Sequence, residues 1–211
     1  MAIYFSRDCL RVLENTVFHE ALESLLQKVK ATLPPETDRY LETFGRTIKV
    51  GTQPHKHYGA FRETLDIVNQ AIIAQKVLRV DYFTMSRKRR SRRKIAPYRL
   101  WFFDGTFYLI AYCYLRRDVR VFAVDRIRSI DMLDENFRLP EEGVVDGFME
   151  TSFGVFRGES VHVKIRFSPK VAGYIGEKTW HATQKLTQLK NGAVLFEAEV
   201  AGTEEIKHWV M

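Results

Sequence analysis

Three strand-like runs, in which side chains of two kinds alternate with a period of two, lie in the middle of the chain. They span Lys94 to Phe103, Thr106 to Leu115, and Val119 to Asp131. Asp104-Gly105 separates the first two and is flanked by aromatic residues, which is a strong short-range signal for a two-residue hairpin turn. A shorter alternating run, Val77 to Phe83, precedes them. The pattern predicts a β unit at the centre of the chain.

Helical periodicity marks the residues that precede this unit. Apolar residues recur at helical spacing from Val17 to Leu33, Thr16 is placed to cap the start, and Pro34-Pro35 stops the helix. A second amphipathic helix is predicted from His57 to Gln75. An apolar stripe of this kind is most often a core contact or a contact with a partner helix.

Strand and helix patterns alternate again after a stretch rich in glycine and acidic residues, Glu141 to Gly158. The order of the predicted elements is β-α-β-β-α, a ferredoxin-like pattern without its last strand. Such a sheet has an open edge, which another chain or further residues would cover. The predicted elements are Ser160–Phe167, Pro169–Lys178, Trp180–Leu189, Ala193–Ala201 and Glu204–Met211.

The faces of the second and third central runs indicate where a ligand would bind. Successive strand side chains point to opposite faces. Each run has one face of mostly aliphatic, core-type residues, and we predict that the other face of each contributes to a mixed tyrosine and arginine surface. Arginine offers fixed donors to phosphate or carboxylate, and tyrosine offers a stacking plane with a polar tip. The alternative is a half-exposed antiparallel sheet whose polar side is simply solvated. The predicted surface carries Tyr108, Ile110, Tyr112, Tyr114, Arg120, Phe122, Val124 and Arg126.

Positive charge is concentrated in one block. The formal net charge of +7 equals the seven cations found in the eight residues from Arg87 to Lys94, so the remaining chain is formally neutral. Such a block attracts phosphate by steering and counterion release. The alternative is a solvated, self-repelling hairpin loop. The candidate electrostatic patch for nucleic acid is Arg87, Lys88, Arg89, Arg90, Arg92, Arg93 and Lys94.

Several spaced motifs in the β unit resemble the WYL domain. They are Pro97-Tyr98-Arg99-Leu100, then Asp104 to Leu109, then Arg120 to Ile127, with Asn136 to Pro140 resembling the exit from the domain. The Trp-Tyr-Leu triplet that names the family is Phe107-Tyr108-Leu109 here. The resemblance implies a small Sm-like, SH3-type β-barrel that occurs in bacterial transcriptional regulators. Family members are thought to sense a ligand, in some cases single-stranded DNA or a nucleotide-like molecule.

The resemblance extends over nearly the whole chain and implies an α+β fold in four parts. A helical linker or dimerisation segment (1–58) precedes the WYL domain (59–140), and a connector (141–159) leads to an incomplete ferredoxin-like C-terminal extension (160–211). In the related regulators a winged helix-turn-helix domain lies upstream, and nothing in this sequence reads as one. Contact with duplex DNA would therefore come through an upstream domain outside this chain. Regulators of this kind pair to match two-fold operators, which predicts a homodimer.

The resemblance also assigns ligand-binding residues. Arginines would hold phosphates, and tyrosines would stack on bases or hydrogen-bond to the ligand. The alternative for Arg126 is an internal salt bridge with Asp125 or another acid. The main candidates are Tyr82, Arg93, Tyr108, Arg120 and Arg126, and the second-rank candidates are Ser86, Tyr98, Tyr112 and Arg116.

Other chemistries find little support in the sequence. The motifs of serine hydrolases, zinc proteases and phosphate-cradling loops are absent, and no pair of carboxylates is placed across a predicted cleft. We therefore expect no enzyme activity and no cofactor. His55-x-His57 alone does not make a metal site, and Cys9 and Cys113 have neither metal nor redox spacing.

The sequence also predicts where the protein is located and what it does. No apolar run is long enough to span a membrane, and Met1 to Leu10 lacks the architecture of a secretory signal, so we expect a cytoplasmic protein. The leading hypothesis is the ligand-sensing part of a bacterial transcriptional regulator that binds an anionic effector. The alternative is a protein-interaction or dimerisation module with no such ligand.

Overall fold

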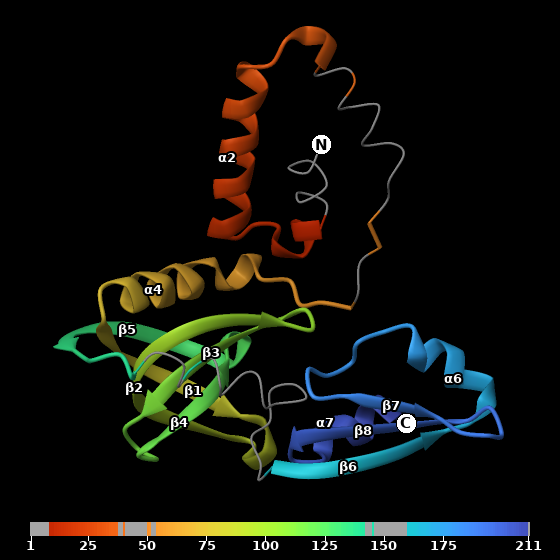
Figure 1. Ribbon diagram of the computed structural model, residues 1–211. Helices are drawn as coiled ribbons and strands as arrows, with labels where there is room; N and C mark the ends of the chain where they lie inside the picture. Colours follow the sequence, from red (N-terminus) through yellow and green to blue (C-terminus); the bar gives the residue numbers. More distant parts are fainter. Residues whose placement is uncertain are drawn as a thin grey trace. The chain divides into compact units, whose positions relative to one another are not determined.

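The structure is a computed structural model that describes residues 9–37, 40, 50–51, 54–141, 145 and 160–210. The chain forms two compact units, Met1–Leu139 and Pro140–Met211. Figure 1 shows the helices and strands of each. Most of the predicted connector, residues 142–144 and 146–159, lies outside the described residues.

The first elements that the structure describes in this unit are a short 3-10 helix, η1 (Leu10–Leu13), and helix α2 (Val17–Ala31). The predicted N-cap of α2 is confirmed, because the Thr16 hydroxyl accepts a hydrogen bond from the His19 backbone N–H at 3.4 Å. The apolar stripe of α2 is only partly covered. Phe18 stacks on Phe107 with ring centroids 5.7 Å apart, whereas Leu25 is 50% exposed.

The centre of the first unit is a five-stranded antiparallel sheet in the order β4-β3-β2-β1-β5. Helix α4 packs on this sheet through Leu65, Val68 and Ala71, all fully buried (Figure 1). The elements are η2 (Gly59–Phe61), α4 (Arg62–Ile73), β1 (Lys76–Thr84), η3 (Met85–Arg87), β2 (Arg89–Phe103), β3 (Thr106–Cys113), β4 (Asp118–Ala123), η4 (Val124–Arg126) and β5 (Ile127–Asn136).

The sheet is open, so the prediction of a closed barrel is wrong. The predicted run Val119 to Asp131 is two strands separated by the single turn η4. β4 pairs with β3 and β5 pairs with β1, which places β4 and β5 at opposite edges of the sheet. At the end of β4, the Ala123 N–H donates to the Tyr82 hydroxyl at 3.2 Å instead of to a neighbouring strand. A side chain thus satisfies a donor that a closed barrel would pair with backbone.

The predicted hairpin turn is confirmed. Asp104 and Gly105 have φ values of 44° and 65°, the left-handed pair that a two-residue hairpin of matching twist requires. The chain before η2 crosses this turn, where the Lys56 N–H donates to the Gly105 carbonyl at 3.1 Å. The Lys56 ammonium also pairs with Asp125 of η4 at 2.8 Å. The segment that enters the sheet therefore ties the hairpin to the turn that carries Arg126.

Tyr58 anchors this entering segment in the core. Its side chain is fully buried, and its hydroxyl accepts a hydrogen bond from the Phe107 N–H at 2.7 Å. Its ring meets Phe107 edge-on, with centroids 5.0 Å apart. Burial raises the pKa of Tyr58 to about 12, because the phenolate would lose its hydration.

Replacing Tyr58 by phenylalanine is expected to lower the free energy of unfolding by about 1–3 kcal/mol near neutral pH, because the buried Phe107 N–H loses its acceptor. The wild type should also lose stability as the pH rises from 10, the ordinary pKa, towards about 12, because the unfolded chain releases this proton first. The variant lacks that contribution. Urea unfolding at pH 10 and at about pH 12 measures this loss of stability. Tyr174→Phe, a substitution at an exposed tyrosine, is the control. Equal stability of Tyr58→Phe and wild type near neutral pH would contradict the anchoring role.

Between residues 160 and 210, the second unit is a three-stranded antiparallel sheet with two helices. Its elements follow the predicted order, and its strands are arranged β6-β8-β7. The predicted strand at Trp180 starts later, because the Gln184 side chain accepts hydrogen bonds from the Trp180 and His181 N–H groups and holds these residues in a turn. The elements are β6 (Ser160–Phe167), α6 (Pro169–Gly176), β7 (Lys185–Gln188), β8 (Val194–Ala201) and α7 (Glu204–Val210).

Candidate anion-binding site

The register of β3 and β4 separates the residues predicted to form one tyrosine and arginine face. Directly paired residues in an antiparallel sheet point to the same side. Phe122 pairs with Leu109, and Arg120 pairs with Ala111, so both lie on the side of the main core. Tyr108 and Tyr112 lie on the opposite side. The prediction of one mixed tyrosine and arginine face is therefore wrong, because Arg120 lies on the side of the sheet opposite Tyr108 and Tyr112.

Tyr82 is the centre of the polar cluster on the core side. Its side chain is 6% exposed, and its ring meets Phe122 edge-on with centroids 5.0 Å apart. Burial is the largest influence on its pKa and raises it, while the Ala123 N–H and the positive charge of Arg126 oppose that rise. Tyr82 therefore remains a neutral phenol at physiological pH.

Arg93 covers the aromatic pair from the neighbouring strand β2. Its guanidinium carbon lies 5.4 Å from the centre of the Tyr82 ring and 5.7 Å from that of Phe122. The guanidinium also donates to the Ser91 hydroxyl at 3.0 Å and the Thr84 hydroxyl at 3.1 Å. Two hydroxyls and two rings thus fix the orientation of a half-buried cation that retains further donors.

Arg126 approaches Tyr82 from η4. The side chain is half-buried, interacts with the Tyr82 hydroxyl, and has a buried Nε without a hydrogen-bond partner. The alternative for Arg126, an internal salt bridge with Asp125 or another acid, is not found among the described contacts, in which Asp125 pairs with Lys56. Among the described residues, neither Arg93 nor Arg126 forms an ion pair with a carboxylate. Half-buried cations without a counter-charge are costly to fold, so their presence together favours an external anion.

Comparison with known proteins assigns both units. Residues 63–132 match the WYL domain family, and residues 159–211 match the WCX domain family. The chain contains a WYL domain followed by a WCX domain. The Tyr82, Arg93 and Arg126 cluster lies entirely within the WYL match.

Two solved structures resemble parts of the chain. Proteasome accessory factor B/C (PafBC) of Arthrobacter aurescens is 24% identical over 76% of this chain, with a TM-score of 0.37, and the match covers 24% of that protein. The crystal structure of a CRISPR Cas-related protein is 14% identical over 72% of this chain, with a TM-score of 0.52, and the match covers 45% of that chain. No curated protein matches. This chain thus spans less than half of either solved protein. The second likeness concerns the fold alone, and the first, with its TM-score of 0.37, is too low to support even the fold.

The tyrosines on the other side of the WYL sheet serve mainly in packing. Tyr98 and Tyr112 pack around Phe137 in a small second cluster, and burial raises the pKa of Tyr98. Tyr108 is half-buried against Trp101, with ring centroids 6.1 Å apart. The strand register places Tyr108 and Tyr112 on the side of the sheet opposite the arginine cluster.

The remaining predicted ligand residues are exposed. Ser86 lies in η3, Arg116 lies in the turn between β3 and β4, and Arg120 pairs with Asp118 at 3.3 Å. Sequence reasoning missed Thr84 and Ser91 as parts of the cluster, whereas it placed Phe122 on the same face as Arg126 without assigning it to the ligand. Thr84 and Ser91 share the alternation of Tyr82 and Arg93 in their strands, which is a signal that the sequence contains.

Most of the basic block is strand, and not the hairpin loop that was the alternative for this segment. Arg89 to Lys94 belong to β2 and pair with β1, and only Arg87 and Lys88 remain in the connecting turn. Because strand side chains alternate between the two faces, Arg89 and Arg93 lie on one side of β2. Arg90, Arg92 and Lys94 lie on the other. Lys94 is engaged with Glu135 and lies over the Tyr114 ring at 5.1 Å. The block therefore contributes positive charge to both faces of the WYL sheet.

The described residues also bear on metal binding and on membrane spanning. No group of three or more His, Cys, Asp or Glu side chains is arranged to hold a metal ion in that part of the chain. The rings of His55 and His57 meet edge-on with centroids 5.4 Å apart. None of the described helices combines the length and the apolar character needed to cross a bilayer.

Proposed function

We propose that the WYL domain binds an anionic effector through Arg93 and Arg126, and that the chain is the ligand-sensing part of a bacterial transcriptional regulator. The observation that carries the proposal is the pair of half-buried arginines at Tyr82 without carboxylate partners among the described residues. In this proposal the function is binding rather than catalysis, in the cytoplasm, and duplex DNA is contacted through a domain outside this chain.

Phosphate is the chemical group that suits this cluster. Guanidinium groups offer several directed donors to phosphate oxygens, and a partly desolvated site strengthens such bonds. The Tyr82 ring is buried beneath Arg93, so we assign it to positioning the arginines rather than to stacking on a base. Single-stranded DNA or a nucleotide supplies the phosphate, and the basic residues at the start of β2 would steer it towards the cluster.

A second function is favoured by α2. Leu25 on the apolar stripe of that helix is 50% exposed, and in this second proposal a partner chain covers the stripe. Under this alternative the chain is an interaction or homodimerisation module, and the basic block serves solubility. The two functions are separated by whether an anion binds at Arg93.

Titration of a labelled single-stranded oligonucleotide, followed by fluorescence anisotropy at several salt concentrations, tests the proposal. We expect saturable binding that Arg93→Met weakens by about tenfold or more, because a directed phosphate contact is lost. Changing Arg87, Lys88 and Arg90 to serine should flatten the salt dependence but leave saturable binding. The matched control is Arg79→Met, an exposed arginine of β1 that is paired with Asp131.

One result would contradict the proposal, and a second would exclude one class of ligand. If binding disappears only when Arg87, Lys88 and Arg90 are changed to serine, the attraction to phosphate is nonspecific. Absence of binding at low salt would exclude single-stranded DNA, and a parallel titration with a mononucleotide then decides whether the cluster binds any phosphate.

A further inference from the structure

One carboxylate oxygen of Asp125 is buried and has no hydrogen-bond partner. Asp125 lies in the turn η4, directly before Arg126. Its Oδ2 pairs with the Lys56 ammonium at 2.8 Å, whereas its Oδ1 is shielded from solvent and receives no hydrogen bond from the described residues. A buried acceptor that no donor reaches is costly, so such an atom in a folded protein is usually satisfied by water or by a ligand.

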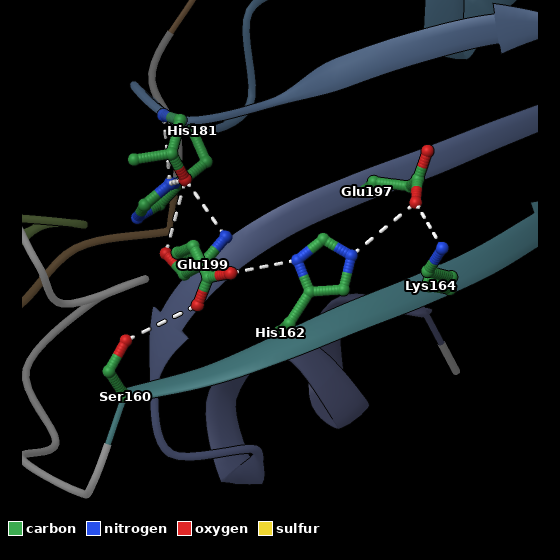
Figure 2. Close-up of polar contacts among 7 residues, drawn as sticks. Ser160, His162, Lys164, His181, Glu197 and Glu199 are labelled. Carbon is green, nitrogen blue, oxygen red and sulfur yellow. Dashed lines mark hydrogen bonds and ion pairs between the residues drawn. The ribbon is translucent and has the colours of Figure 1, made fainter.

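Acids in the WCX unit show the contrast, because they are matched within the protein. His162 contacts Glu199 at 2.8 Å and Glu197 at 3.4 Å, and Lys164 pairs with Glu197 at 2.7 Å (Figure 2). Among the described residues, only Asp125 has a carboxylate oxygen that is both buried and without a hydrogen-bond partner. The feature is therefore specific to the turn η4.

Asp125 lies beside the arginine cluster. Burial is the largest cause of the raised pKa of both Tyr82 and Tyr58, and the negative charge of Asp125 raises both further. The carboxylate therefore lies near the phenol ring that Arg93 covers. Asp125 and Arg126 are adjacent in one helical turn, and adjacent side chains of such a turn do not face each other. Each can therefore interact with a separate group of one ligand.

The turn thus contains two buried polar atoms of opposite kind without a partner. Arg126 Nε is a donor and suits a phosphate oxygen, whereas Asp125 Oδ1 is an acceptor and suits an O–H or N–H group. A doubly ionised phosphate offers no such donor, but the sugar hydroxyls and base amino groups of nucleotides do. We propose that Asp125 determines specificity, because its Oδ1 accepts a hydrogen bond from the sugar or base of a nucleotide whose phosphate binds Arg93 and Arg126. This inference rests on the proposed anion-binding function.

Isothermal titration of the full chain with adenosine monophosphate and two analogues tests this inference. Dideoxyadenosine monophosphate lacks the sugar hydroxyls, and purine riboside monophosphate lacks the base amino group. We expect at least one analogue to bind about tenfold more weakly than adenosine monophosphate, because the buried acceptor then stays unpaired. The analogue that binds weakly identifies the donor. This comparison uses only the wild-type protein, so it does not depend on how a variant folds.

Removing the acceptor should change the affinities for two kinds of ligand in opposite directions. Asp125→Ala should weaken the binding of adenosine monophosphate about tenfold, because the hydrogen bond is lost. It should strengthen the binding of sulfate, a tetrahedral anion without a donor, several-fold, because a negative charge beside the site is removed. Lys56→Met removes the partner of Oδ2 but keeps Oδ1, so the discrimination between nucleotides should persist. Asp131→Ala, the same charge change at an exposed acid paired with Arg79, should leave the affinities unchanged.

Three outcomes would overturn the inference, and they can be told apart. Equal affinity for all three nucleotides, or binding of sulfate alone, would mean that Asp125 Oδ1 holds only water, while the proposed anion site would stand. Weaker sulfate binding by Asp125→Ala would make Asp125 a structural residue of η4. If neither sulfate nor any nucleotide binds the wild type at low salt, the proposed anion-binding function fails, and this inference fails with it.

Discussion

Replacing Arg126 by methionine is expected to weaken anion binding by about 100-fold while leaving the free energy of unfolding unchanged or higher. A half-buried guanidinium that contacts a bound phosphate contributes several kcal/mol, because its charge is partly desolvated before the ligand arrives. The same group has a buried Nε without a partner, and no carboxylate pairs with it among the described residues. Methionine keeps an unbranched apolar stem and removes the uncompensated charge, which should stabilise the free protein by up to about 1 kcal/mol.

Two measurements on one pair of variants check this expectation. Isothermal titration with a mononucleotide gives the affinity, and urea unfolding without ligand gives the stability. Arg79→Met is the matched control, because Arg79 is exposed and paired with Asp131. The control should retain the wild-type affinity and stability to within about 0.5 kcal/mol. If Arg126→Met lowered stability by several kcal/mol, Arg126 would be a structural residue of η4, and its assignment to the ligand would fail.

The Gly105→Ala variant is expected to lose about 3 kcal/mol of unfolding free energy. A Cβ at this position would lie 2.6 Å from the Pro54 carbonyl oxygen and 2.7 Å from the His55 Cα. Both contacts are to backbone, which cannot move aside as a flexible side chain does. The φ value of 65° adds about 1 kcal/mol of strain for any residue with a Cβ. Either the hairpin turn or the entering segment must therefore shift.

The same variant should also weaken anion binding several-fold, although Gly105 is not in the arginine cluster. A displaced entering segment would break the Lys56 hydrogen bond to Gly105 and loosen the Lys56–Asp125 ion pair, which holds the turn next to Arg126. Chemical unfolding and nucleotide titration measure the two effects. Gly173→Ala, in helix α6 where a new Cβ meets nothing within 4 Å, is the control and should be neutral or stabilising. A Gly105→Ala protein of wild-type stability would contradict the close approach.

Local features of the fold followed from the sequence. Asp104-Gly105 predicted its turn because few residue pairs adopt two positive φ values at low cost. Thr16 predicted its cap because a hydroxyl before an apolar helical repeat satisfies a free N–H group. The alternation in Ser160–Phe167 likewise predicted a strand with the observed bounds. In each case the deciding interaction is between residues close in the chain, or depends only on the strand's own periodicity.

Only the tertiary structure decided which faces meet. Alternation assigns Arg120 and Phe122 to one face of their own strand, but it does not say which face of β3 that face joins. The pairing register does, and a shift of one residue exchanges the two faces. The break at η4 likewise depends on how β5 reaches β1, a contact far apart in sequence. The sequence by itself determined the hairpin turn at Asp104-Gly105, most of the strands and the choice of candidate arginines. The register placed Arg93 and Arg126 at Tyr82, because that choice depends on contacts between strands that no single segment encodes.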